Sequence, residues 1–301
     1  MEKMPGFDEG EKKLKPEIRL EFFRHDRREL ATPQRPDEKS PLTEVGRRHA
    51  TEVGKTKNPK PETGFAYASP RERAQETAMR QFLADEEWID DETTLEEIND
   101  EIKKRLPYGQ KLSVSEKLNF RFDADPEFAR AFDKHYLEMK DALRFLYSES
   151  DALVKKLDDL DDYSYTRLAA NIAEFVKKYI IMLPRWRQIL EDHPEKYEGI
   201  NEMQRFLGMH ATIGESFLLK VIEKTEGIDA ARQFIEDLPD KNGIDFSEGI
   251  SMTIGFDEDV PKVKITFHDK TWEVDEALID EIISDRTKLD EGIRKKLAER
   301  K

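Results

Sequence analysis

The chain has 301 residues, of which 39% are charged and 37% hydrophobic, and its formal net charge is −15. This composition is typical of globular proteins and excludes a fibrous or low-complexity chain. Because an acidic surface repels nucleic acid and anionic lipid, we expect neither as a partner, although clustered arginines could still bind a small anion.

The sequence contains no cysteine, which excludes disulfides, cysteine-based zinc sites and a thiolate nucleophile. Its longest apolar runs, such as residues 179–183, are far too short to cross a bilayer, so we expect no membrane partner. A cytoplasmic location agrees with both observations and is the one we expect. Residues 1–16 are rich in Gly, Pro, Glu and Lys, and we predict a flexible tail there.

The first predicted strand ends in an arginine and a histidine. Residues 18–22 alternate between apolar and charged side chains before Phe23, and Arg24 and His25 follow. In open α/β sheets, ligands bind at the carboxyl ends of the strands. A guanidinium group suits phosphate, and a neutral imidazole can act as nucleophile or base. Thr43 is then predicted to cap a helix that reaches about residue 54.

A second strand-to-helix corner follows the predicted short strand over residues 65–68. Ser69 is predicted to be the helix N-cap, with Pro70 at the first helical position and Glu72 completing a capping box. Arg73 would then lie one turn into the helix, beside the carboxyl end of the strand.

The later pattern is extended over residues 92–98 and then mainly helical to about residue 200, with helices predicted from about residues 125 and 164. A strand over residues 204–209 leads to His210, so a third strand end carries a functional side chain. The remaining predictions are a helix at 216–224, strands at 250–256 and 263–274 with a reversal at 268–270, and a helix from 275.

Together these segments resemble the histidine phosphatase superfamily, which has the phosphoglycerate-mutase-like fold. The family pattern is Arg-His-Gly, Leu-Thr-x-x-Gly, Ser-x-x-x-Arg-Ala-x-x-Thr-Ala and a later histidine after a strand. The matching segments are Arg24-His25, residues 41–50 (PLTEVGRRHA), residues 69–78 (SPRERAQETA), residues 95–98 (LEEI) and His210. The likeness covers about residues 18–100 and 203–274, and residues 69–78 are its most specific part.

The resemblance implies an α/β fold, a three-layer α/β/α sandwich around a mixed, mainly parallel sheet. Residues 17–102 and 201–301 would form the α/β core. Residues 103–200 would form a helical insertion that caps the site, and caps of this kind exclude water and set specificity.

The resemblance also implies a role for each motif residue. His25 would be the nucleophile that becomes a phosphohistidine, and Arg24, Arg73 and His210 would bind the phosphate. His210 would also belong to the catalytic group. Simpler interpretations stay open at this point, since Arg73 could pair with Glu76 on an exposed helix face and His210 could be a structural histidine.

Glu97 would be the general acid, with Glu96 as its immediate competitor. The family pattern requires no metal and no cofactor, and we expect neither here. One departure is Asp26, which stands where the family has glycine. It could repel substrate, orient Arg27 or mark a lost activity. His49 is assigned no chemistry.

The expected function is hydrolysis of phosphate monoesters through phosphohistidine, without metal. One alternative is a phosphoglycerate-type phosphomutase, and another is a catalytically silent phosphate-binding or protein-interaction module. The expected partner is a small phosphorylated substrate or a phosphoprotein. A homo-oligomer is left open, because apolar residues of the C-terminal helix could pack on the body or on a second subunit.

Overall fold

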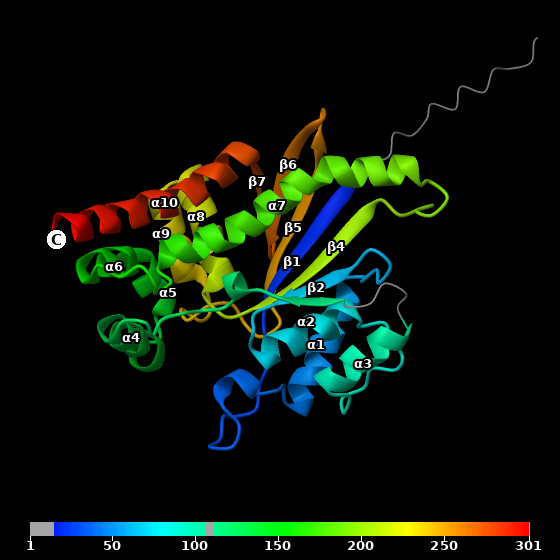
Figure 1. Ribbon diagram of the computed structural model, residues 1–301, viewed down its shortest axis with the longest axis horizontal. Coiled ribbons are helices and arrows are strands. Elements are labelled where there is room, and N and C mark those ends of the chain that lie inside the picture. The colour runs from blue at the N-terminus through cyan, green and yellow to red at the C-terminus, as the bar shows by residue number, and fades with distance from the viewer. Residues whose placement is uncertain (1–14, 106–110, 301) are drawn as a thin grey trace, which may run out of the picture.

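A seven-stranded mixed sheet runs through the part of the chain that the computed structural model describes, residues 15–105 and 111–300 (Figure 1). The strand order is β3-β2-β4-β1-β5-β6-β7. The first four strands in this order pair in parallel and the other three pairings are antiparallel. The strands are β1 (Glu17–Arg24), β2 (Phe65–Ala68), β3 (Leu112–Val114), β4 (Glu202–Met209), β5 (Gly249–Asp257), β6 (Val260–Phe267) and β7 (Lys270–Asp275).

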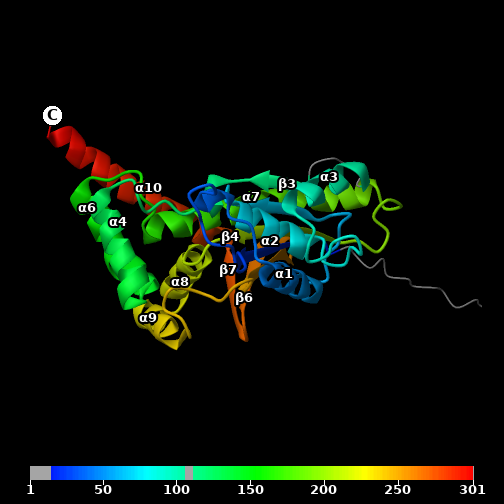
Figure 2. The same cartoon turned by 90° about the horizontal axis from the view of Figure 1, so that it is seen from below.

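Helices cover both faces of the sheet, because its central strands are apolar on both sides (Figures 1 and 2). Within β1, Phe22 packs into one hydrophobic cluster and Phe23 into the other. The first cluster holds α7 (Tyr165–Asp192), α8 (Ile213–Thr225) and α10 (Glu276–Glu299), and the second holds α2 (Glu72–Phe82) and α3 (Leu95–Arg105). Helix α1 (Glu44–Thr56) packs on α2. The three-layer α/β/α prediction is therefore confirmed.

The segment expected to be a cap, residues 103–200, has three parts in the structure. β3 pairs with β2 in the sheet, and α7 packs on the sheet face, so both belong to the layers. Only the stretch between them, from about residue 119 to 164, lies outside the layers, next to α8 and α10 (Figure 1). Its elements are α4 (Pro126–Asp133), the π-helix η3 (Lys134–Met139), α5 (Ala142–Phe145), the π-helix η4 (Leu146–Ser150) and α6 (Asp151–Leu157).

Several local predictions are confirmed. The Thr43 hydroxyl caps α1 by accepting from Gly46 N–H at 3.1 Å, and Asp125 caps α4. The chain reverses between β6 and β7 where it was expected to. The predicted tail, residues 1–16, lies almost wholly outside the described residues. No helix in the described ranges is both long and apolar enough to cross a bilayer.

The extended piece predicted over residues 92–98 was wrong, because α3 begins at Leu95. Its start is a capping box, in which the Glu97 carboxylate accepts from Thr94 N–H at 2.7 Å and from the Thr94 hydroxyl at 2.8 Å. In return, Glu97 N–H donates to that hydroxyl at 3.3 Å. Such reciprocal bonds satisfy backbone donors that a helix start leaves unpaired, and they favour helix over strand here.

The N-cap predicted at Ser69 was also wrong, because α2 begins two residues later than expected, at Glu72. The Ser69 hydroxyl instead lies 2.7 Å from Nε2 of His210. Four further elements were not predicted: η1 (Asp37–Lys39), the strand β3, η2 (Glu116–Leu118) and α9 (Ile228–Asp237).

Candidate active site

The residues of the site follow the carboxyl ends of three neighbouring parallel strands, which lie at one edge of the sheet. Arg24 at the end of β1 is in register with Met209 of β4, and His25 N–H donates to Met209 O at 2.8 Å. On the other side of β4, Ser69 N–H after β2 donates to Gly208 O at 3.0 Å. His25 and His210 therefore follow adjacent strands, where the carboxyl ends of a parallel sheet place ligand sites.

The helix after β2 lies unusually close to β4, because residue 208 is glycine. A Cβ atom at Gly208 would lie 2.3 Å from Ala74 O in α2, which no real Cβ atom tolerates. This close approach brings Arg73, the residue before Ala74, over the histidine pair. Its guanidinium Nε lies 3.1 Å from Nε2 of His25.

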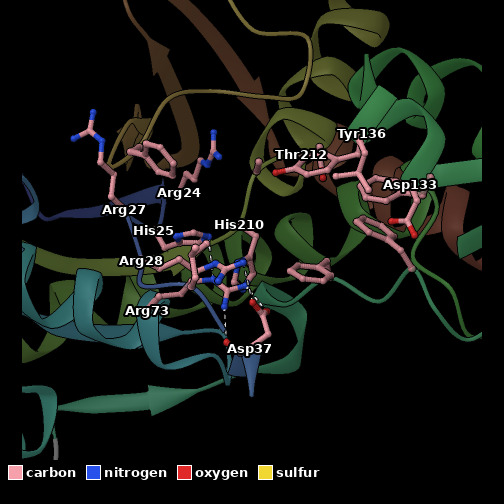
Figure 3. Close-up of a pocket in the computed structure, with 17 residues that line it drawn as sticks. Arg24, His25, Arg27, Arg28, Asp37, Arg73, Asp133, Tyr136, His210 and Thr212 are labelled. Carbon is pink, nitrogen blue, oxygen red and sulfur yellow. Dashed lines mark hydrogen bonds and ion pairs between the residues drawn. The ribbon is translucent and has the colours of Figure 1, made fainter. Parts of the chain in front are cut away.

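These side chains line a cavity of about 580 Å³ (Figure 3). Its walls include the predicted nucleophile His25 and the three residues predicted to bind phosphate, namely Arg24, Arg73 and His210. They also include Arg27, Arg28 and Asp37. In a protein of net charge −15, this local excess of guanidinium groups favours an anionic ligand.

The hydrogen bonds of His25 identify which of its nitrogens carries the proton. Nδ1 lies 2.7 Å from the backbone carbonyl oxygen of Asp26, which can only accept, so Nδ1 is the N–H donor. Nε2 then has a free lone pair and accepts from Arg73 Nε–H. Burial, followed by the charge of Arg73, lowers the pKa of His25 well below its usual value of 6.5. The imidazole is therefore neutral at neutral pH, as a nucleophile requires.

His210 is the second imidazole of the site, with its ring centroid 5.1 Å from that of His25. Burial lowers its pKa well below 6.5, and the repulsion that a protonated His210 would meet from a protonated His25 and from Arg73 adds to this effect. Its Nδ1 is buried without a hydrogen-bond partner among the described residues, and so are Arg24 Nε and the Thr212 hydroxyl. Buried polar atoms are rarely left unpaired, so three of them beside one cavity favour a polar ligand there.

Asp37, which the sequence analysis missed, holds the arginines in place. Arg73 donates to the Asp37 backbone oxygen at 2.8 Å and to its carboxylate at 3.0 Å. Arg28 pairs with the same carboxylate at 2.9 Å, and Arg71 pairs with it as well. Burial raises the pKa of Asp37, but Arg73 and Arg28 outweigh this effect and hold it below its usual value. Burial lowers the pKa of Arg73 to about 10, so both groups stay charged at neutral pH.

The side chain of Asp26 is fully buried and is not part of the cavity wall. Its carboxylate accepts from the Ser247 hydroxyl at 2.5 Å, from Nδ1 of His49 at 2.6 Å and from Arg27 N–H at 2.7 Å. Asp26 N–H donates to the Thr77 hydroxyl at 3.0 Å. Since the Asp26 carbonyl holds His25, this network fixes the position of the imidazole. No local sequence pattern predicted the roles of His49 and Ser247.

Glu97, predicted to be the general acid, is not brought to this site. Neither Glu97 nor Glu96 lines the cavity, and both are exposed. The Glu97 carboxylate is engaged in the capping box of α3, whose hydrogen bonds to Thr94 keep its pKa below the usual value. A carboxyl group held ionised in this way cannot donate a proton at neutral pH.

No family model and no curated protein sequence matches the chain. Solved structures do resemble it, among them mycobacterial hydrolase 2, with 13% identity and a TM-score of 0.45 over 90% of this chain and 98% of that one. A mycobacterial glucosyl-3-phosphoglycerate phosphatase has 14% identity and a TM-score of 0.43, covering 79% and 90%. A phosphoserine phosphatase from Entamoeba histolytica has 14% identity and a TM-score of 0.36, covering 82% and 94%.

Two of these structures carry the name of a phosphatase. Their TM-scores lie below 0.5, so they assign no activity to this chain. The chemistry is therefore inferred from the geometry of the cavity.

Replacing Asp26 by alanine should destabilise the protein by roughly 3 kcal/mol, because three donors would lose their buried acceptor. Urea unfolding of Asp26→Ala against the wild type measures this loss. The matched control is Asp85→Ala, which removes an exposed carboxylate from the surface and should change the free energy of unfolding by no more than about 0.5 kcal/mol. A loss below about 1 kcal/mol for Asp26→Ala would contradict the role of the network.

The lowered pKa values of the two histidines predict that acid destabilises the fold. Below about pH 6.5 these histidines bind protons in the unfolded chain but not in the folded chain. The stabilisation that they contribute to the free energy of unfolding is therefore complete well above pH 6.5 and is lost as the pH drops. His210 alone should contribute up to about 1.4 kcal/mol of this fall between about pH 7.5 and 5.5. Urea unfolding at both pH values should show a smaller difference for His210→Asn than for the wild type, and equal differences would refute the prediction.

Proposed function

We propose that this protein is a phosphatase that hydrolyses phosphate monoesters through His25. One observation carries the proposal: a neutral imidazole whose Nδ1–H is held by a backbone carbonyl while its Nε2 lone pair meets Arg73 at the wall of a cationic cavity. Surface histidines do not combine burial, a fixed tautomer and a neighbouring guanidinium. The combination is what nucleophilic attack on a phosphate dianion requires.

In the proposed reaction, the phosphate group lies among Arg24, Arg73 and His210. Nε2 of His25 attacks phosphorus, an N–P bond forms, and the P–O bond to the leaving group breaks with its electron pair. Water then attacks phosphorus, and the N–P bond breaks with its electron pair returning to Nε2, which restores the neutral imidazole. One proton of the water stays on the released inorganic phosphate, and the other goes through solvent to the departed oxygen of the leaving group. Arg73 would exchange its bond to His25 for one to a phosphate oxygen, so that its charge stabilises the transferring group.

The site supports hydrolysis on a small phosphorylated substrate or a phosphoprotein, and the same first step would serve a phosphomutase. The two differ in the fate of the phosphoenzyme, which a mutase retains and a phosphatase hydrolyses quickly. A silent phosphate-binding module would bind phosphate in the same cavity without forming the N–P bond. Trapping the phosphoenzyme therefore separates the three functions.

Turnover of p-nitrophenyl phosphate should fall by roughly 10³-fold or more in His25→Ala, because the nucleophile is lost. The matched control is His193→Ala, which removes an exposed histidine outside the cavity and should leave turnover unchanged. Wild-type turnover should persist in excess chelator, since no step uses a metal.

A rapidly quenched phosphoenzyme should be labile to acid and stable to base, as a phosphohistidine is. Turnover that survives in His25→Ala, or a label with the opposite stability, would assign the chemistry to another residue.

Substitutions at Glu97 should separate the capping role from the acid role. Glu97→Gln keeps a capping box and should retain both stability and turnover, whereas Glu97→Ala should lose about 0.5–1 kcal/mol of stability but keep turnover within about twofold. Unfolding by urea and initial rates on one phosphate ester measure the two effects. A hundredfold drop in kcat for Glu97→Gln would restore Glu97 as the general acid.

A further inference from the structure

A row of aromatic rings runs from the histidine pair along one wall of the cavity. We call Phe120, Phe122, Phe132 and Tyr136 the aromatic wall, because all four line the cavity. Tyr136 is labelled in Figure 3. The ring centroid of Phe120 lies 4.9 Å from that of His210, edge to face. The row then continues by near-parallel stacking, with centroid distances of 5.6 Å, 4.0 Å and 5.7 Å in chain order.

The aromatic wall differs in burial from the core rings behind it. Phe128 and Phe145 pack behind it and are fully buried, which is the usual position of core rings. By contrast, Phe120, Phe132 and Tyr136 are only partly buried and face the cavity. The chain therefore leaves large apolar rings exposed inside a site whose other end is cationic.

A further ring lies on the side of His25. The centroid of Phe246 is 6.3 Å from that of His25, and the guanidinium carbon of Arg24 lies 4.3 Å above its ring. Each histidine of the site thus has a phenyl ring beside it. The group attached directly to a bound phosphate would meet these rings first.

We propose that the substrates are aryl phosphates, in which the phosphate ester oxygen is bonded directly to an aromatic ring. This inference rests on the proposed phosphatase function and deepens it. An aromatic leaving group would pack against the aromatic wall at Phe120, one face of which carries the Arg71 guanidinium at 4.1 Å, whereas the hydroxyls of a sugar or glycerol phosphate would lose water hydrogen bonds against phenyl rings. Tyrosine phosphate, free or within a peptide, is the biological group with this chemistry.

Neither acidic side chain of the cavity is well suited to protonate a leaving group, which favours a leaving group that needs no proton donor. Asp37 is bound to three arginines, and Asp133 is exposed at the α4 end of the cavity. A phenol ionises near pH 10, so a phenolate leaves far more readily without a proton donor than an alkoxide does. The aryl group therefore lowers the demand on general acid catalysis.

Two exposed leucines line the cavity and bear on the source of the aryl phosphate. Leu30 is 80% exposed and Leu137 is 59% exposed. Apolar residues on either side of a phosphotyrosine in a peptide could contact them, which free phosphotyrosine cannot do. A peptide and the free amino acid share the recognised group and form separate arms of the test.

The test compares kcat/KM for phosphotyrosine and phosphoserine, which differ in the ester-bearing group, in wild type and Phe120→Leu. Loss of the ring should lower kcat/KM for phosphotyrosine about three- to tenfold, mainly through KM, and leave phosphoserine within about twofold. Phe65→Leu, on β2 and outside the cavity, is the matched control and should change neither substrate. A phosphotyrosyl peptide with flanking leucines, tested against Leu30→Ser, gives the second arm.

Binding to His25→Ala by calorimetry keeps the two proposals distinguishable, because this variant retains the aromatic wall. Tighter binding of phosphotyrosine than of phosphoserine, together with a loss of this preference when Phe120→Leu is added, supports the aryl proposal. Absence of turnover of any ester by the wild type would refute the proposed hydrolysis but not this preference. Turnover of phosphoserine or adenosine monophosphate at rates equal to phosphotyrosine would overturn the aryl proposal and leave the phosphatase intact. An equal loss for both substrates in Phe120→Leu would likewise overturn it.

Discussion

The hydrogen bond from Nδ1 of His25 to the backbone carbonyl of Asp26 is the interaction on which the site depends. It fixes the tautomer, and so it decides that the free lone pair lies on Nε2, next to Arg73. A backbone acceptor cannot titrate, so this choice does not change with pH. Burial then keeps the ring neutral, and together the two effects prepare a nucleophile without a carboxylate partner on the imidazole.

Holding several arginines beside one cavity is costly unless an anion accompanies them, and Asp37 meets part of that cost. It joins Arg28, Arg71 and Arg73 through a single carboxylate and one backbone oxygen. Arg24 is held separately, through a bond of 2.7 Å to Ile244 O, and its Nε keeps a free donor. Glu38 also pairs with Arg71, at 3.5 Å, but two carboxylates do not neutralise these four arginines, which favours an anionic ligand.

The sequence predicted the site residues at the strand ends better than the residues that hold them in place. Strand alternation before Arg24 and the short strand before Ser69 mark where side chains leave the sheet, because that information is local. Glu97 was predicted to be the acid because residues 95–98 are similar to the family's acid segment, and the sequence did not reveal that its carboxylate caps a helix outside the cavity. Ser247 lies 221 positions from Asp26, and no local pattern predicts a pairing over that separation.

The antiparallel half of the sheet takes part in the site through one loop, residues 238–248, which leads into β5. This loop places Ile244 O on Arg24, Phe246 beside His25 and the Ser247 hydroxyl on the Asp26 carboxylate. Ser247 adopts a φ of 58°, a strained backbone conformation for a residue other than glycine, and it is held there by Arg24 O and Gln81.

Asp26, which stands where the family pattern has glycine, does not place its carboxylate in the cavity wall. Its carboxylate satisfies donors behind the nucleophile, and the departure from the family pattern does not by itself favour a silent module.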